Sequence, residues 1–335
     1  TLNQTAASTY SGRFSGSGEI VKTGTAAFTF AGTDPTGLFT GTLRVNQGLM
    51  VLSGNTNQFA GISAIHLTGS TSSLRLDNDQ TTAVGSRIND NATVTLNSTS
   101  GTTTDSLGLY MRRNAGASTG TEQVGQLILN SGANTVAASG TATDRIARIL
   151  FSNATPLVRN NFSTLLIVGQ SLNATTGQRG RISFSVDPGG SIGGGGAAAS
   201  QTISIFPYMV GEDTGTTAPS GATHFGNSFM RYEGGTVNDM RALNLSTEYT
   251  VDEANFNALA AGVTTNNVRF TSTPSGAVDS DTTAINSLVL DHATGLTLTG
   301  PAQALQITSG AILSAGAGAN VIDGYTSITS GTGNP

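Results

Sequence analysis

Several acidic residues stand in pairs that could perform acid–base chemistry or bind a metal ion. The pairs are Asp77 with Asp79, Glu212 with Asp213, Asp252 with Glu253, and Asp279 with Asp281. Hydrolysis of a glycosidic bond needs two carboxyl groups, and calcium prefers hard oxygen ligands. However, Asp77 and Asp79 flank Asn78 in the manner of a turn, and no second acidic cluster lies beside them in the sequence. We therefore expect turn residues here, with calcium binding at 77–79 as the alternative.

Two other features suggest catalysis or metal binding only weakly. The run Gly116-Ala117-Ser118-Thr119-Gly120 matches the G-x-S-x-G pattern of a nucleophilic serine, which requires a preceding strand and a following helix. No helical apolar period follows it, so a turn is expected. The three histidines, His66, His224 and His292, are far apart in the sequence, and there is no cysteine. We therefore expect no catalytic residue, no cofactor and no metal site.

The composition excludes further classes of protein. The 335 residues include 15 Lys and Arg against 20 Asp and Glu, which gives a net charge of −5. A nucleic-acid partner is not expected, because its binding depends on a clustered basic surface. No apolar run approaches the roughly 18 residues of a membrane-spanning helix, so no membrane span is expected in this segment. Hydrophobic residues make up 37 % of the chain, which is enough to form a core.

Short apolar–polar–apolar triplets recur along the chain and indicate its fold class. Examples are Leu43-Arg44-Val45, Ile65-His66-Leu67, Val94-Thr95-Leu96 and Ile182-Ser183-Phe184, each followed by turn-forming residues. A period of two places the outer residues of each triplet on one face of a strand. An all-β fold is therefore predicted. Because units of strand, glycine turn and strand recur locally, a solenoid of stacked coils is favoured over a sandwich or a barrel.

The regular pattern is interrupted between residues 207 and 265. This stretch is richer in Pro, Met and aromatic residues, and Thr250 with Glu253 fits a capping box that would begin one short helix. We expect coils over 1–206, an irregular insertion over 207–265, and coils again over 266–335 that continue beyond the last residue.

Aromatic residues in and beside this insertion form a candidate contact surface for a partner. They are Phe206, Tyr208, Phe225, Phe229 and Tyr232. Large apolar groups on an excursion from a regular body can form a binding site. The alternative is that they fill a small core of the insertion itself.

The N-terminal part of the chain, about residues 9–70, resembles the autotransporter-associated β-strand repeat. The resemblance rests on Tyr10-Ser11-Gly12, Gly16-Ser17-Gly18, Lys22-Thr23-Gly24, Phe28-Thr29-Phe30-Ala31-Gly32 and the run Phe39-Thr40-Gly41-Thr42-Leu43-Arg44-Val45-Asn46-Gln47-Gly48. Stretches around 229–232 and 307–314 are similar, more loosely, to the later part of large repeat-rich bacterial surface proteins. The resemblance implies a right-handed parallel β-helix that is exported and extracellular, and it supplies no catalytic residue.

These observations lead to a structural hypothesis. The chain is expected to be an extracellular β-solenoid segment of a large bacterial surface adhesin or filament, and not an enzyme. Its expected partners are further coils of a longer chain or other copies in a fibre, with a glycan or cell-surface protein as a further possibility. Two alternatives stay open: a β-helix enzyme that acts on polysaccharide, and a glycan- or protein-binding module that acts through 207–265.

Overall fold

The protein is all-β, built of short strands that form large parallel sheets. The computed structural model describes residues 1–34, 36–54, 58–78, 84–99, 107–113, 119–140, 145–172, 179–217, 219, 224–234, 238–257, 259, 264–278 and 284–331. The chain divides into two compact units. The first unit consists of Thr1–Pro188, Glu212–His224 and Tyr232–Met240, and the second of Gly189–Gly211, Phe225–Arg231 and Arg241–Pro335.

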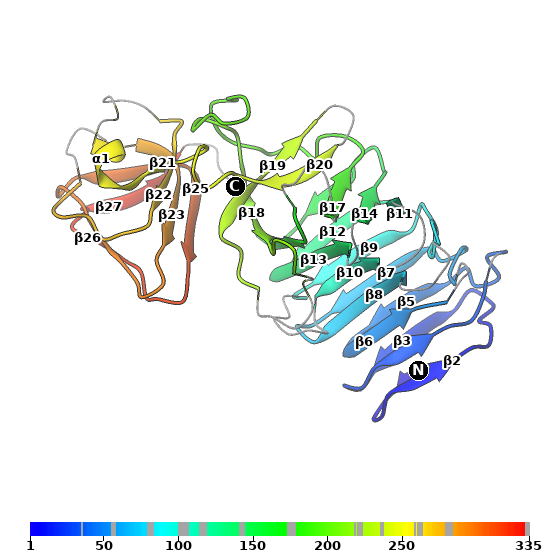
Figure 1. Cartoon of the computed structure of the whole chain (residues 1–335). Coiled ribbons are helices and arrows are strands. Elements are labelled where there is room, and N and C mark those ends of the chain that lie inside the picture. The colour runs from blue at the N-terminus through cyan, green and yellow to red at the C-terminus, as the bar shows by residue number, and fades with distance from the viewer. Residues whose placement is uncertain are drawn as a thin grey trace. The chain divides into compact units, whose positions relative to one another are not determined.

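In the first unit, strands that follow one another along the chain enter two parallel sheets in turn, as the blue-to-green strands in Figure 1 show. The strands of the first sheet are, in order, β1 (Leu2–Asn3), β3 (Glu19–Thr23), β5 (Thr42–Val45), β7 (Ala64–Thr68), β9 (Thr93–Asn97), β12 (Leu127–Ser131) and β15 (Leu157–Arg159). The second sheet has 13 strands, of which seven pair in parallel in this order: β2 (Ser8–Tyr10), β4 (Phe28–Phe30), β6 (Gly48–Leu52), β8 (Ser72–Asn78), β10 (Gly108–Arg113), β13 (Ala133–Gly140) and β16 (Thr164–Gly169).

From β10 onward, each pair of consecutive strands, one in each of these two sheets, is followed along the chain by a third strand. These strands, β11 (Thr119–Val124), β14 (Ile146–Phe151) and β17 (Arg179–Phe184), pair with one another in parallel. Three more, β18 (Phe206–Asp213), β19 (Ser228–Glu233) and β20 (Asp239–Ala242), divide their residues between the two units. The pairings of β17 with β20 and of β18 with β19 are antiparallel.

The apolar residues of successive strands lie in register and form the core of the first unit. Leu43 is opposite Ile65, Ile65 is opposite Val94, and Val94 is opposite Leu127. All four side chains are fully buried, whereas the intervening Arg44 is only half-buried. Since each strand is only a few residues long, its apolar side chains are buried only by stacking on those of its neighbours.

Lys22, the only lysine of the chain, has a structural role at the turn that follows β3. It is fully buried, and its Nζ donates hydrogen bonds to the backbone oxygens of Thr23 (3.0 Å), Gly24 (2.7 Å) and Gln47 (3.0 Å). Burial lowers the pKa of Lys22. Because Gln47 follows the next strand of the same sheet, the side chain ties two successive turns together.

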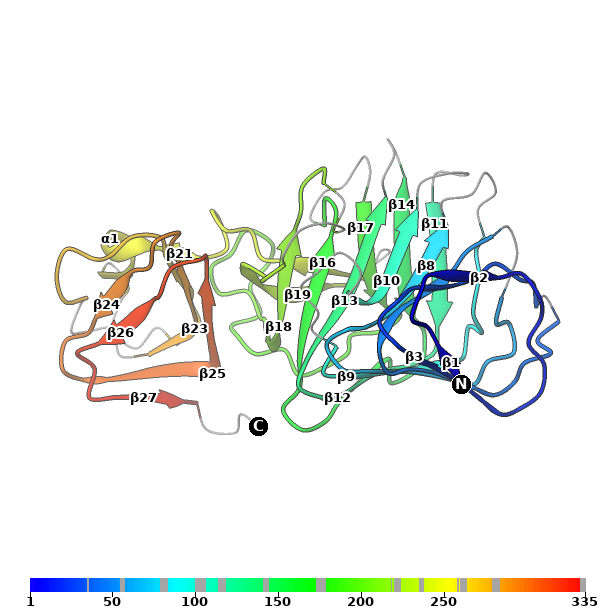
Figure 2. The ribbon, with the colours of Figure 1, turned by 90° about the horizontal axis from the view of Figure 1, so that it is seen from below.

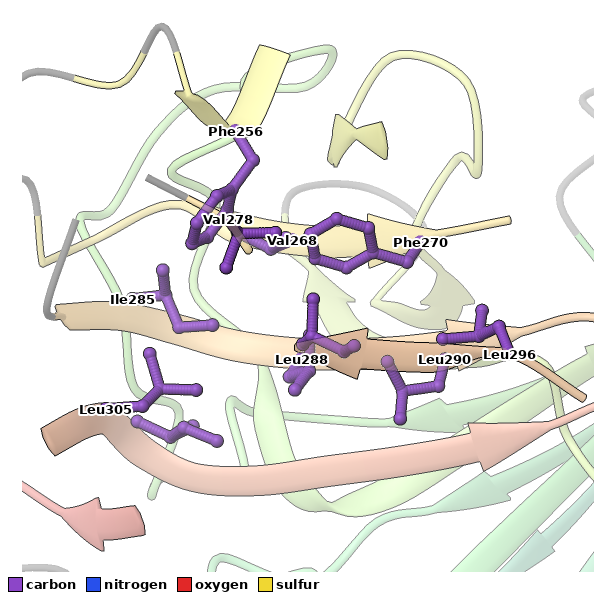
Figure 3. Close-up of a cluster of buried hydrophobic side chains, with 11 residues drawn as sticks. Phe256, Val268, Phe270, Val278, Ile285, Leu288, Leu290, Leu296 and Leu305 are labelled. Atoms are coloured by element: carbon purple, nitrogen blue, oxygen red, sulfur yellow. The ribbon is translucent and has the colours of Figure 1, made fainter. Parts of the chain in front are cut away.

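The second unit has two parallel sheets of its own, whose strands Figure 2 shows in yellow to red. The larger sheet consists of β21 (Thr250–Val251), β22 (Asn267–Phe270), β23 (Ala284–Asp291), β25 (Ala304–Ala315) and β27 (Ser327–Ser330), and the smaller of β24 (Thr297–Thr299) and β26 (Val321–Asp323). Figure 3 shows its core, in which Val268, Phe270, Leu288 and Leu290 of the sheet meet Phe256 of helix α1 (Asp252–Asn257).

The stretch 207–265 contains β18 to β21 and α1, and its residues are divided between the two units. The helix begins at Asp252, so Thr250 is not its N-cap. Thr250 instead lies in β21, where it pairs with Val268, and its hydroxyl donates a hydrogen bond to Oε1 of Gln201 at 3.0 Å. Within the described ranges, no helix has the length and apolar character that crossing a membrane requires.

Candidate functional site

The structure does not gather the five candidate contact aromatics on one exposed surface. Phe206 and Phe229 are buried, Tyr208 and Tyr232 are half-buried, and Phe225 is exposed at 70 %. The rings of Phe206 and Tyr208 meet edge to face with their centroids 6.2 Å apart. Phe229 packs in a buried cluster of the second unit, and the Tyr232 hydroxyl donates to a backbone oxygen of the first unit at 3.3 Å. Most of this group therefore serves internal packing.

Asp77 lies in strand β8 and not in the predicted turn, and two arginines neutralise it. The register places it opposite Arg112 of β10. Nη2 of Arg112 lies 3.0 Å from Oδ2 of Asp77 and Nε lies 3.2 Å from Oδ1, while Nε of Arg75 lies 3.4 Å from Oδ2. Both carboxylate oxygens are thus engaged by guanidinium groups, which suits an ion pair between strands better than a calcium ligand or a general base.

The other acidic candidates that the structure describes serve local hydrogen bonds. Oδ1 of Asp213 accepts the N–H of Gly215 at 2.9 Å, and the carboxylate of Asp252 accepts the N–H and the hydroxyl of Thr271 at 2.7 and 2.8 Å. Their neighbours Asp79, Asp279 and Asp281, and the side chain of Glu253, lie outside the described residues. Among the residues described, no three His, Asp or Glu side chains come together in a group that could hold a metal ion.

The G-x-S-x-G run does not have the context that a nucleophilic serine requires. Its first three residues, 116–118, lie outside the described ranges, but Thr119 and Gly120 begin β11. A strand therefore follows the motif where the nucleophile elbow needs a helix.

A buried arginine that the sequence analysis does not single out forms the most unusual charged site of the first unit. The side chain of Arg87 is fully buried, and its guanidinium donates four hydrogen bonds to protein oxygens. The acceptors are Oδ1 of Asn78 (2.6 Å), Oε1 of Gln58 (2.7 Å), and the backbone oxygens of Gly54 (2.8 Å) and Asp77 (2.9 Å). Burial lowers the pKa of Arg87 to about 10, so it stays charged at neutral pH.

Glu122 of β11 completes this site, which we call the Arg87–Glu122 cluster. Its fully buried carboxyl group accepts the backbone N–H of Arg87 at 2.8 and 2.9 Å and that of Ile88 at 2.8 Å. Burial raises the pKa of Glu122 to about 8, although the two N–H donors and the charge of Arg87 act to lower it. The sequence contains one signal for its burial. Glu122 lies two residues before the core residue Val124 in the same strand, so both side chains are on the same face of β11.

Arginine–carboxylate pairs recur on the strands of both units. Besides Arg112 with Asp77, they join Arg44 to Glu19 (2.8 Å), Arg148 and Arg181 to Asp239 (3.3 and 3.5 Å), Arg241 to Glu248 (2.7 Å) and Arg269 to Asp291 (2.7 Å). Each of these acids is held by an arginine, and most pairs join neighbouring strands. In the described part of the chain, these ion pairs therefore link strands to one another or to the turns beside them.

Comparison with protein-family models, with curated proteins and with solved structures finds no match for this chain. The functional assignment therefore depends on the geometry of the chain and on the residues of its N-terminal stretch.

We expect His224 to titrate above pH 6.5 in the folded protein. Its Nδ1 lies 2.8 Å from Oε1 of Glu212, and its Nε2 lies 2.5 Å from the backbone oxygen of Pro219. Both partners are acceptors, so both ring nitrogens can donate only when both are protonated, and the two contacts favour that form. Burial alone lowers the pKa of His224, but these hydrogen bonds and the charge of Glu212 outweigh it, and the pKa is raised.

An NMR titration of the three histidines measures this directly. His66 is the internal control, because burial and the neighbouring Arg44 lower its pKa. Since the folded pKa of His224 is raised, its stabilisation is present below pH 6.5 and is lost as the pH rises through the folded pKa. The substitution Glu212→Gln should bring the His224 pKa down. A native His224 that titrates below His66 would contradict the expectation.

Proposed function

We propose that this chain is a structural segment of a right-handed parallel β-helix that belongs to an exported bacterial surface adhesin or filament. The register of successive strands carries the proposal. In the first sheet Ile20, Leu43, Ile65, Val94 and Leu127 face one another in sequence. Each step in this series spans roughly 20–35 residues, which is within the range of solenoid repeats. Each successive strand of this sheet thus contributes one apolar residue at the same position in the core, as expected for a stacked solenoid.

The second unit supports the same interpretation independently. Val268 is opposite Leu288, and Leu288 is opposite Ile312. Its smaller sheet also pairs in parallel, with Leu298 of β24 opposite Ile322 of β26. The spacing between partners is again that of one solenoid repeat in both sheets. In each unit, parallel partners therefore recur at a spacing that suits a solenoid repeat, although the spacing in the first unit lengthens along the chain.

The residues that carry the N-terminal resemblance support a structural repeat, because three of them have specific structural tasks. Lys22 bonds two successive turns, while the rings of Phe30 and Phe39 pack against Phe59 in tilted arrangements at centroid distances of 5.1 and 5.7 Å. The motif is thus accounted for by packing between coils, which is what a structural repeat needs.

Electron microscopy of the purified chain and of the source cells tests the proposal. We expect elongated particles from the chain, with end-to-end association at high concentration, and we expect antibodies against it to label intact cells. Compact globular particles alone would overturn the β-helix. Labelling only after the cells are broken open would overturn the surface location while leaving the β-helix in place.

A further inference from the structure

The turn between β15 and β16 places a phenylalanine in a backbone conformation that disfavours it. The N–H of Ser163 donates to the oxygen of Asn160 at 3.0 Å, and the two central residues, Asn161 and Phe162, have φ values of 49° and 52°. Two successive positive φ angles define a type I′ turn, whose usual second residue is glycine. A bulky residue with positive φ is a conformational outlier.

The other turns between these two sheets show what the backbone requires there. Gly24, Gly48, Gly69 and Gly132 have φ values of 79°, 71°, 94° and 63°. Glycine thus supplies the left-handed conformation at four of these turns, as its missing Cβ allows, and the small residue Ser98, with a φ of 58°, supplies it at a fifth. Phe162 is therefore not the residue that the turn itself would select.

The turn is also held in place without the Phe162 ring. Nδ2 of Asn161 donates to the oxygen of Asn130 at 2.9 Å, and the hydroxyl of Ser163 donates to the oxygen of Leu129 at 2.9 Å. Nε of Arg159 donates to the oxygen of Ser163 at 2.8 Å. The ring itself is 77 % exposed, so it buries little apolar surface. Strain at a residue that the fold does not need is typical of a functional position.

We propose that Phe162 is a binding residue that stacks on a neutral sugar ring of an oligosaccharide. An aromatic face attracts the weakly positive C–H groups on one side of a pyranose, because the centre of the ring carries negative charge density. The sugar hydroxyl groups would then find hydrogen-bonding partners in the exposed polar side chains of the same turn, Asn160 and Asn161.

The surroundings of the ring favour a sugar over a protein partner. A protein interface needs a contiguous apolar core, whereas the same turns of the two preceding passages carry Asn97 with Ser98 and Asn130 with Ser131. Arg159 is the only charged residue of this turn, and its Nε bonds a backbone oxygen of the turn, which argues for a neutral sugar over an acidic one. The inference does not depend on the proposed β-helix, since it rests on one turn.

Titration of the whole chain with soluble oligosaccharides of glucose, galactose, mannose and N-acetylglucosamine, followed by saturation-transfer NMR and calorimetry, tests the site. We expect at least one of them to bind, with affinity reduced about tenfold or lost in Phe162→Gly and Phe162→Leu and retained in Phe162→Tyr. Phe225→Ala, which removes the other highly exposed phenylalanine, should bind as the native chain does.

Thermal unfolding of Phe162→Gly gives a second and independent measurement. Because glycine relieves the positive φ, the Tm should stay the same or rise even though binding is lost. A lower Tm would assign the ring to packing and overturn the proposal. So would binding of none of these oligosaccharides, or binding that is unchanged in Phe162→Gly.

Discussion

Replacing Arg87 with methionine should unfold the first unit at a much lower urea concentration than in the native chain. The substitution keeps much of the side-chain volume but removes the donor to four oxygen atoms, on Asn78, Gln58, Gly54 and Asp77, and all of these hydrogen bonds except the one to Gly54 are buried. Each buried acceptor left without a donor costs about 1–3 kcal/mol. A hydrogen bond to a charged group contributes about 1.5–3 kcal/mol, so the loss of four of them should lower the free energy of unfolding by several kcal/mol.

The matched control is Arg44→Met, which breaks the ion pair with Glu19. Both side chains of that pair are exposed, at 37 % and 40 %, so its loss should change stability by less than about 1 kcal/mol. Arg87→Lys should fall between the two variants, because one ammonium group cannot reach every acceptor that the planar guanidinium reaches. Equal urea midpoints for Arg87→Met and Arg44→Met would show that the buried cluster contributes no more than a surface pair.

The core strands could be predicted from the sequence because their signal is local. Leu43-Arg44-Val45 and Ile65-His66-Leu67 alternate over three residues, and the structure buries the outer residues of both triplets. The alternation fixes which face of a strand is apolar. It does not fix which strand lies beside it, since the pairing partner is far away along the chain and the local pattern contains no information about it.

The charged sites could not be predicted for the same reason. Asp77 was interpreted as a turn residue because it follows an apolar triplet, yet β8 continues through Asn78 and places Asp77 opposite Arg112, 35 residues later. Arg87 and Glu122 meet across a similar distance in the sequence. The alternation of side chains along β11 places Glu122 on the buried face, but this alternation does not identify the residue that it contacts.

The exposure of the aromatic side chains depends on the strand or turn in which each residue lies, and the composition of a stretch does not reveal this. Phe206 and Phe229 were grouped with Phe225 because all lie in or beside an irregular stretch, but the first two face the interior from β18 and β19. The exposure of Phe162 and its positive φ arise from the turn that holds it, so its residue type alone contains no signal for either.

Replacing Glu248 with glutamine should destabilise the second unit by about 3–5 kcal/mol, the usual cost of leaving one member of a buried ion pair alone. Oε1 of Glu248 accepts the N–H of Ala199 and Nη2 of Arg241, both at 2.9 Å. Oε2 accepts the N–H of Asn244 and Nη1 of Arg241, both at 2.7 Å. A glutamine amide would present N–H groups to one pair of these donors and leave the Arg241 charge without its counter-ion.

The pH dependence of the free energy of unfolding distinguishes the effect of losing the Glu248 charge from the effect of altered packing. Burial alone would raise the pKa of Glu248, but the bonds from Arg241, Asn244 and Ala199 overcome this effect and lower it below 4.5. The stabilisation is therefore complete above the unfolded pKa and disappears as the pH falls through the folded one. Urea unfolding followed by tyrosine near-UV circular dichroism should show the native chain and Glu248→Gln converging in stability at acidic pH. If the difference in the free energy of unfolding between the native chain and Glu248→Gln stayed constant with pH, the variant would be destabilised through packing. The charge of Glu248 would then not be what stabilises its contacts with Arg241 and Ala199.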